Sequence, residues 1–302
     1  MGIDNTQINF SQDNLLLLNI SIGFIMFGVA LNLTVADFRR LFLNPRPALV
    51  GVLSQFIILP LITFLLVLLI QPAASIALGM IMVAACPGGN ISNFMSVLGK
   101  GNVALSVTLT AFSTILAVFL TPFNLSFYGS MYGPANEILT EVEMSYFAVF
   151  KTIVTIFGIP IVLGMLFRHY FTSTAIKVEK MMKVLSILIF AGIIVLAFRA
   201  NLEIFYEYIH LVIYIVFFHN AIALITGYQL GRVFNLPSPD KKTLAIETGI
   251  QNTALGLLLI FSFFNGLGGM ALVAAWWGIW HIFSGLSLAF IWNYQQNKAI
   301  TI

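Results

Sequence analysis

The chain has 302 residues, of which 60% are hydrophobic and only 8% are charged. Soluble globular domains carry about 25% charged residues, so this composition excludes a soluble protein and predicts one integral membrane unit over residues 1–302. A single cysteine, Cys86, excludes an intrachain disulfide and a cysteine metal cluster. The net charge of +3 does not indicate a nucleic-acid partner, because the basic residues lie beside apolar runs, where they report membrane topology.

Nine apolar runs have about the 20 residues that a helix needs to cross a hydrocarbon core. In chain order they lie near residues 14–33, 47–70, 74–99, 102–123, 144–167, 180–198, 209–233, 242–264 and 270–292. The longest connection, at 124–143, separates the first four runs from the last five. We therefore expect an all-α integral membrane fold with nine transmembrane helices.

The connections between these runs alternate in the sign of their charge. One alternate set holds nearly all the basic residues, such as Arg39, Lys100 and Lys177, and the other holds acids such as Glu137 and Glu203. By the positive-inside rule, the basic side faces the cytoplasm. The expected location is therefore a multi-pass cell (inner) membrane, with the N-terminus outside and the C-terminus in the cytoplasm.

The first four and the last four runs share a pattern. In each set the third run, at 74–99 and at 242–264, is interrupted by polar or helix-breaking residues, and the fourth carries hydroxyl or imidazole groups. Because five runs separate the equivalents, the two copies have opposite orientations in the membrane. Inverted repeats with interrupted helices at matching positions are typical of secondary transporters.

Amide and hydroxyl side chains occur inside the second and fourth runs. Gln55 precedes Pro60 in an otherwise apolar segment, and is either a ligand or an interhelical hydrogen-bonding group. Ser106, Thr110 and Ser113 are spaced at i, i+4 and i+7, so they share one helix face. The alternative for each hydroxyl is a hydrogen bond to its own helix backbone.

The run at 74–99 contains Cys-Pro-Gly-Gly-Asn-Ile-Ser-Asn at 86–93. Proline removes a backbone donor and paired glycines let the chain leave the helical conformation, so we expect a helix broken near the bilayer midplane. Such a break frees carbonyl groups that can bind cations and amide groups that attract anions. A simple proline kink lined by small residues is the alternative.

Glu247 is an acid in the middle of a largely apolar run. A charged side chain at the bilayer centre costs about 2.5–3.5 kcal/mol on insertion scales. A bound cation or a proton would offset that cost, and Gln251 and Asn252 bring further polar groups to a similar depth. The alternative is a protonated Glu247 that is hydrogen-bonded to a neighbouring helix.

These segments resemble the bile acid:sodium symporter family. The resemblance rests on the motif at 86–93, and on Gly-Asn-Val-Ala-Leu-Ser-Val at 101–107, His-Asn at 219–220, Glu-Thr-Gly-Ile-Gln-Asn at 247–252 and Trp-His-Ile-Phe-Ser-Gly at 280–285. It implies two broken helices that cross in a core domain, with a panel domain beside it. The panel would contain the runs near 14–33, 144–167 and 180–198, and the core the runs near 47–70, 74–99, 102–123, 209–233, 242–264 and 270–292.

By this resemblance, two sodium ions bind at the breaks. One site would consist of Ser92, Asn93, Ser106, Thr110 and Glu247. The other would consist of the side chains of Gln55, Glu247 and Gln251 with the backbone carbonyls of Thr248 and Ile250. These are hard oxygen donors, which suit a hard cation such as Na⁺. The substrate would lie against Asn90, Asn252 and His281.

The expected function is sodium-coupled symport of an organic anion, either bile acid-like or a small carboxylate, by alternating access, with no enzymatic activity. The expected partners are that anion, two transported Na⁺ ions and the lipid bilayer, with neither nucleic acid nor an obligatory protein partner. Two rival transport functions are proton coupling and metalloid export through Cys86. A third rival is an intramembrane hydrolase that pairs a serine with His219 or His281, although buried histidines more often serve packing.

Overall fold

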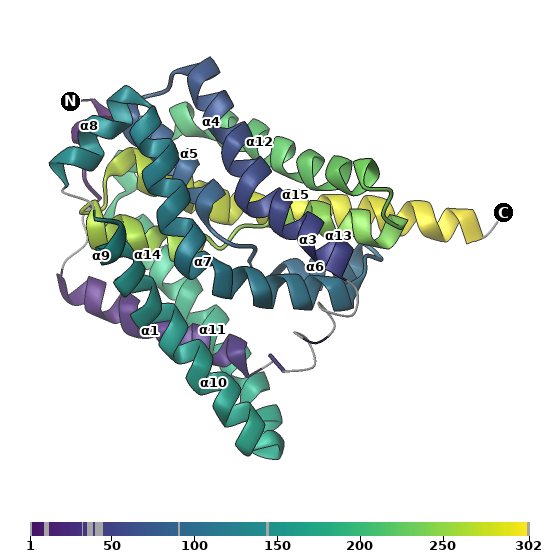
Figure 1. Ribbon diagram of the computed structural model, residues 1–302. Helices are drawn as coiled ribbons and strands as arrows, with labels where there is room; N and C mark the ends of the chain where they lie inside the picture. Colours follow the sequence, from purple (N-terminus) through teal and green to yellow (C-terminus); the bar gives the residue numbers. More distant parts are fainter. Residues whose placement is uncertain are drawn as a thin grey trace.

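The computed structural model describes residues 2–8, 12–31, 33–34, 39, 45–89, 91–142 and 145–300 of the chain. Within these ranges every named element is a helix, and Figure 1 shows long helices lying side by side. The first elements are η1 (Ile3–Asn5), α1 (Gln12–Ala30), α3 (Pro45–Leu53), the π-helical turn η2 (Ser54–Ile58), α4 (Leu59–Ile70), α5 (Ala74–Ala85), α6 (Ile91–Leu98) and α7 (Val103–Met131). The others are α8 (Gly133–Glu141), α9 (Tyr146–Ile153), the π-helical turn η3 (Val154–Gly158), α10 (Ile159–Tyr170), α11 (Thr172–Ala200), α12 (Leu202–Val233), α13 (Ser238–Gly249), α14 (Thr253–Phe263) and α15 (Gly268–Ile300).

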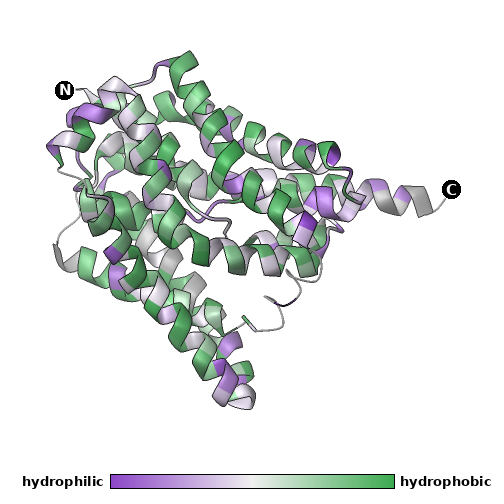
Figure 2. Cartoon of the chain, in the orientation of Figure 1, coloured by the Kyte–Doolittle hydropathy of each residue, from purple (hydrophilic) through white to green (hydrophobic). Residues whose placement is uncertain are grey.

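Several helical stretches have the length and composition of membrane spans. Within the described ranges, five are long and apolar enough to cross a membrane, and they cover Pro45–Ile70, Val103–Met131, Tyr146–Tyr170, Leu202–Val233 and Gly268–Gln295. Large apolar side chains point outward, and Leu69 is 80% exposed. Figure 2 shows hydrophobic residues over the whole length of these helices and hydrophilic ones mainly near their ends. Such an apolar surface suits lipid, which supports the expected membrane fold.

The sequence and the structure differ in where some helices begin and end. α7 continues past the expected end at residue 123, and α7 and α8 together occupy most of the expected connection at 124–143. The polar residues near that point are buried and have partners in neighbouring helices, because Thr121 donates to the carbonyl of Ala85 and Asn124 donates to that of Phe56. A helix with its polar groups satisfied in this way need not end where its apolar run ends. Likewise, α11 begins at Thr172 rather than near residue 180.

Three helices form a group at one side of the molecule. α1 packs on α10 and α11, and Figure 1 shows these three below and to one side of the remaining helices. In the larger group α12 packs along α13, and α15 packs along α5. The larger group contains both interrupted helices, which end and restart at 85–91 and at 249–253.

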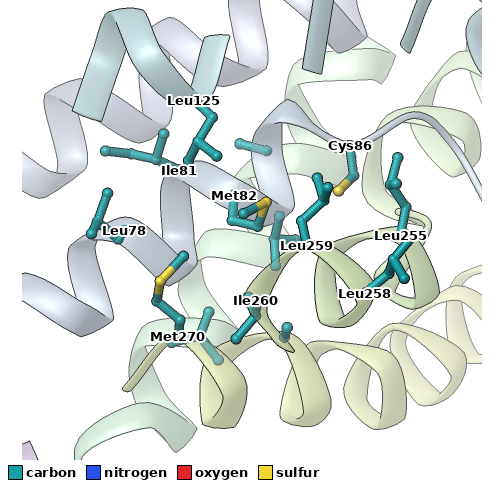
Figure 3. Close-up of a cluster of buried hydrophobic side chains, with 14 of the residues drawn as sticks. Leu78, Ile81, Met82, Cys86, Leu125, Leu255, Leu258, Leu259, Ile260 and Met270 are labelled. Atoms are coloured by element: carbon teal, nitrogen blue, oxygen red, sulfur yellow. The ribbon is translucent and has the colours of Figure 1, made fainter. Parts of the chain in front are cut away.

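A buried apolar cluster packs the first half of one interrupted helix against the second half of the other. Leu78, Ile81 and Met82 of α5 lie with Leu258 and Leu259 of α14 (Figure 3). Cys86 lies in the same cluster, is fully buried, and would be 3.6 Å from a side chain added at Gly256. The cysteine therefore serves as a small packing residue, and the cluster holds the two breaks close together.

Candidate functional site

The two helix breaks meet through backbone hydrogen bonds. Gly88 and Gln251 form an isolated antiparallel bridge. The Gly89 amide donates to the Ile250 carbonyl at 2.7 Å, and the Asn252 amide donates to the Pro87 carbonyl at 2.8 Å. A side-chain carbon at Gly88 would lie 2.9 Å from Glu247 Oε2, so this approach requires glycine. The helix interruption expected from Pro87 and the glycines is therefore present, and its residue Gly88 lies against the Glu247 side chain.

The Glu247 carboxylate is fully buried and is surrounded by hydroxyl groups from two other helices. Ser92 and Ser106 each donate to Oε1 at 2.5 Å, and Thr110 donates to Oε2 at 3.0 Å. Asn93 also reaches this group, because its Oδ1 accepts from Thr110 at 3.4 Å. The structure thus brings together all five residues that the resemblance assigned to the first sodium site. No lysine or arginine in the described part of the chain pairs with Glu247.

The residues assigned to the second sodium site lie beside the first. Gln55 donates from Nε2 to the backbone carbonyl of Glu247 at 3.0 Å. Gln251 donates to the carbonyl of Thr248 at 2.7 Å, and the Ile250 carbonyl accepts from Gly89. The side-chain oxygen Oε1 of Gln251 is buried and has no hydrogen-bond partner. These residues are also neighbours, and one oxygen among them is free to bind a cation.

These oxygens fit a sodium ion. Buried carboxylates and buried amide oxygens need compensation, and hydroxyl groups can rotate so that their oxygens face a cation. The donor set contains one carboxylate and several neutral oxygens, and the described part of the chain has no group of three or more His, Cys, Asp or Glu side chains that could hold a metal ion. This chemistry suits a hard monovalent cation better than a transition metal.

The residues assigned to the substrate are placed less closely together. Asn252 caps α14, because its Oδ1 accepts from the Leu255 amide at 3.2 Å. His281 is 5% exposed, and its Nδ1 is buried with no partner. Thr253 lies against Gly278, one turn before His281, but no hydrogen bond between His281 and Asn252 occurs in the part of the chain described. Asn90 lies outside the described residues.

Sequence reasoning missed several polar contacts around the breaks. Ser54 bonds to the Thr248 hydroxyl at 2.7 Å, and Gln55 Oε1 accepts from Ser113 at 2.5 Å. Ser54 and Gln55 are consecutive and both buried inside the π-helical turn η2. A π-helical turn has a wider register than an α-helix and is frequent at functional sites. The nearby Pro60 was the available signal, since proline removes one backbone donor.

A second missed contact involves the His219–Asn220 pair of α12. Asn220 donates to the carbonyl of Gly249, the last residue of α13, at 2.8 Å and accepts from Ser284 at 2.6 Å. His219 bonds through Nε2 to the Thr63 hydroxyl at 2.7 Å and packs edge-on against Trp277. His219 therefore makes packing contacts, which was one of the two roles considered for it from the sequence.

Comparisons with known proteins show which family the chain resembles. The family model described as Sodium Bile acid symporter family matches residues 19–208. The "Uncharacterized sodium-dependent transporter YocS" of Bacillus subtilis (strain 168) is 32% identical over 281 residues, which cover 93% of this chain and 84% of that protein.

Longer eukaryotic proteins are also similar. The "Probable sodium/metabolite cotransporter BASS2, chloroplastic" of Oryza sativa subsp. japonica is 30% identical over 276 residues, 86% of this chain and 64% of that protein. The "Sodium/bile acid cotransporter 5" of Rattus norvegicus is 29% identical over 256 residues, 84% of this chain and 57% of that protein. This chain therefore spans less than two thirds of the rice and rat proteins. From the family match and these identities, the chain belongs to the sodium bile acid symporter family, a family of sodium-dependent transporters.

Proposed function

We propose that this protein couples the movement of two sodium ions to the uptake of a small organic anion, bile acid-like or a carboxylate, by alternating access. The observation that carries the proposal is the buried Glu247 carboxylate, which is enclosed by Ser92, Ser106 and Thr110 and has no cationic side chain as partner in the described ranges. Leaving such a carboxylate ionised in a membrane interior is costly, and a sodium ion bound among these oxygens would offset that cost.

The first ion would bind to Ser92, Asn93, Ser106, Thr110 and Glu247. The second would bind to Gln55, Glu247 and Gln251, with the carbonyls of Thr248 and Ile250 completing its shell. The unpartnered Oε1 of Gln251 supports the second site, because a buried acceptor without a donor favours a cation. Glu247 would then be shared by both ions, so loss of this carboxylate would weaken both sites together.

The substrate would bind where the breaks meet, against Asn90, Asn252 and His281. The second halves of the broken helices, α6 and α14, begin next to this junction. Helix N-termini attract negative charge, which favours an anionic substrate. With two Na⁺ for each monovalent anion, one net positive charge would enter per cycle, and it would gain about 2.3 kcal/mol per 100 mV of membrane potential.

Alternating access would follow from movement of one helix group against the other. We infer nine spans with the N-terminus outside, an inverted repeat, a panel formed by the spans near 14–33, 144–167 and 180–198, and a core formed by the rest. The helices α1, α10 and α11 pack mainly on one another, with a smaller contact between α1 and the broken-helix segment α14, and this supports the division. A rigid core that carries the ion sites could then expose them to either side in turn.

The rival functions find less support. Metalloid export needs an accessible thiolate, but Cys86 is fully buried beside the α14 glycine Gly256. A hydrolase needs a serine activated by a base, but the hydrogen-bond partner of the His219 ring is Thr63. The transport family and the transport-type broken helices both favour a carrier.

The test is the thermal stability of the purified protein in Na⁺ and in K⁺, for the wild type and Glu247→Gln. Because a ligand that binds only the native state raises the melting temperature, the wild type should melt higher in Na⁺ by several degrees. Glu247→Gln keeps the shape of the side chain and should lose this difference. Glu137→Gln, a change at an exposed acid of α8, is the matched control. An equal response to both cations in active wild-type protein would contradict sodium coupling.

A further inference from the structure

A column of buried polar groups continues from the Glu247 site toward one end of the molecule. On α13, Thr243 lies one turn before Glu247 and Asp240 lies one turn before Thr243. On α7, Asn102 lies one turn before Ser106, and on α6, Ser96 lies one turn after Ser92. Each step of four residues is about 6 Å along a helix. All three helices therefore carry polar residues from the proposed ion site toward the same end.

The members of this column contact one another at the start of α13. Asn102 donates from Nδ2 to Asp240 Oδ1 at 2.8 Å, and its backbone amide donates to the Thr243 hydroxyl at 2.8 Å. Thr243 donates in turn to the carbonyl of Asn102 at 3.2 Å. A side-chain carbon at Gly101 would lie 2.6 Å from the Thr243 hydroxyl and 3.3 Å from the Ser96 carbonyl. The Thr243 hydroxyl and the backbone carbonyl of Ser96 therefore both lie beside Gly101.

In the described part of the chain, one group in the column has no hydrogen-bond partner and another has no cationic partner. Ser96 is fully buried, and its hydroxyl has no hydrogen-bond partner. Asp240 is only 5% exposed, and in the described part of the chain it pairs with no lysine or arginine. Its neighbours point elsewhere, since Lys241 packs against Gly231 and Lys242 lies over the ring of Trp292. A free buried hydroxyl one turn from the proposed sodium site and a buried acid two turns from it suit the same cation.

We propose that Asp240, Thr243, Asn102 and Ser96 form a relay site through which a sodium ion passes between the Glu247 site and the cytoplasm. This inference rests on the proposed function, and the cytoplasmic assignment follows from the basic residues at this end, including Lys100 and Arg232. The ion would exchange its ligands at Glu247 for the hydroxyl of Ser96, the hydroxyl of Thr243 and the carboxylate of Asp240. Asp240, at the cytoplasmic end of the relay, would raise the local concentration of cations. It would thereby raise the rate at which sodium ions enter and leave the Glu247 site.

A purely structural role for Asp240 is also consistent with its place in the first turn of α13. There, its negative charge would stabilise the helix through the helix dipole, and its carboxylate would accept the hydrogen bond from Asn102. Asp240→Asn separates the two roles, because the asparagine oxygen still accepts the Asn102 hydrogen bond but carries no charge. Asp240→Ala removes both. Ser96→Ala removes a hydroxyl that makes no hydrogen bond with any described residue, so it should not destabilise the fold. Ser126→Ala is its control, since the Ser126 hydroxyl is likewise buried and unpartnered, about 30 Å further along α7 from Ser106.

The experiment measures equilibrium binding of ²²Na⁺ to the purified protein and its rates of association and dissociation. We expect Asp240→Asn to slow both rates by about tenfold with little change in affinity, because a relay lies on the path and not at the final site. Ser96→Ala should slow them by a smaller factor, and Ser126→Ala should not. Wild-type rates in both Asp240→Asn and Ser96→Ala would overturn the relay, as would an effect seen only in Asp240→Ala. Absence of ²²Na⁺ binding to the wild type would instead refute the proposed function itself.

Discussion

The two helix breaks at the centre of this protein are built in different ways. The break between α5 and α6 follows Pro87, Gly88 and Gly89, residues whose own backbone properties interrupt a helix. The break between α13 and α14 contains no proline, and side chains stabilise its ends: Asn220 on the Gly249 carbonyl and Asn252 on the Leu255 amide. The first break depends on local sequence, whereas the second also depends on a distant partner, Asn220.

The breaks also contribute different chemistry to the site. The first supplies neutral groups, the hydroxyl of Ser92 and the amide of Asn93, and glycines that allow close approach. The second supplies the charge, through Glu247, and the free oxygen of Gln251. A cation site divided in this way is complete only when both breaks are in register, so the ions would report on the relative position of the two helices.

The largest expected effect comes from adding a methyl group at the first break. Gly88→Ala would place its Cβ 2.9 Å from Glu247 Oε2 and 3.0 Å from Gln55 Nε2, so these groups must separate. Overpacking of this kind costs about 1–3 kcal/mol, and we expect the sodium-dependent rise in melting temperature to disappear. Gly192→Ala, at a glycine of α11 with open space around it, is the control. Retained sodium stabilisation in Gly88→Ala would show that the first break does not shape the site.

A smaller effect is expected at the second break. Asn220→Ala removes the donor to the Gly249 carbonyl, which is buried, and an unsatisfied group there costs about 1–3 kcal/mol. Because Gly249 lies two residues from Glu247, we expect weaker sodium binding as well as a lower melting temperature, measured by titrating Na⁺ in the thermal assay. Ser284→Ala, which removes a contact to Asn220 and leaves its bond to Gly249, should have a weaker effect. If Asn220→Ala were destabilised but bound sodium with unchanged affinity, Asn220 would contribute to the stability of the fold and not to the sodium site.

The smallest effect is expected at the cysteine beside the first break. Cys86→Ala leaves a small void in the apolar cluster and should cost about 1 kcal/mol, with the sodium response intact. The measurement is sodium-dependent uptake and thermal shift in the same preparation. Loss of transport with unchanged stability would revive a thiol-dependent mechanism such as metalloid export.

Features that depend on a single segment could be predicted from the sequence. The interruption at 86–93 and the shared face of Ser106, Thr110 and Ser113 are both present, the first two hydroxyls on Glu247 and the third on Gln55. The course of α7 beyond residue 123 could not be predicted, because Asn124 resembles the end of a span until its partner, the Phe56 carbonyl, is known. The burial of Asp240 was missed for the same reason, since an acid in a first turn normally faces water.

By itself, the sequence determined the membrane class, the first helix break and the identity of the one acid in the middle of a span. These follow from hydropathy, proline and glycine chemistry and charge, which each residue carries regardless of its neighbours. Only the tertiary structure decided which oxygens surround Glu247, how Asn220 stabilises the second break and that polar groups continue to Asp240. Those contacts join residues far apart in the chain, such as Gln55 and Glu247, and hydropathy reports the cost of burying a polar group but not the partner that offsets it.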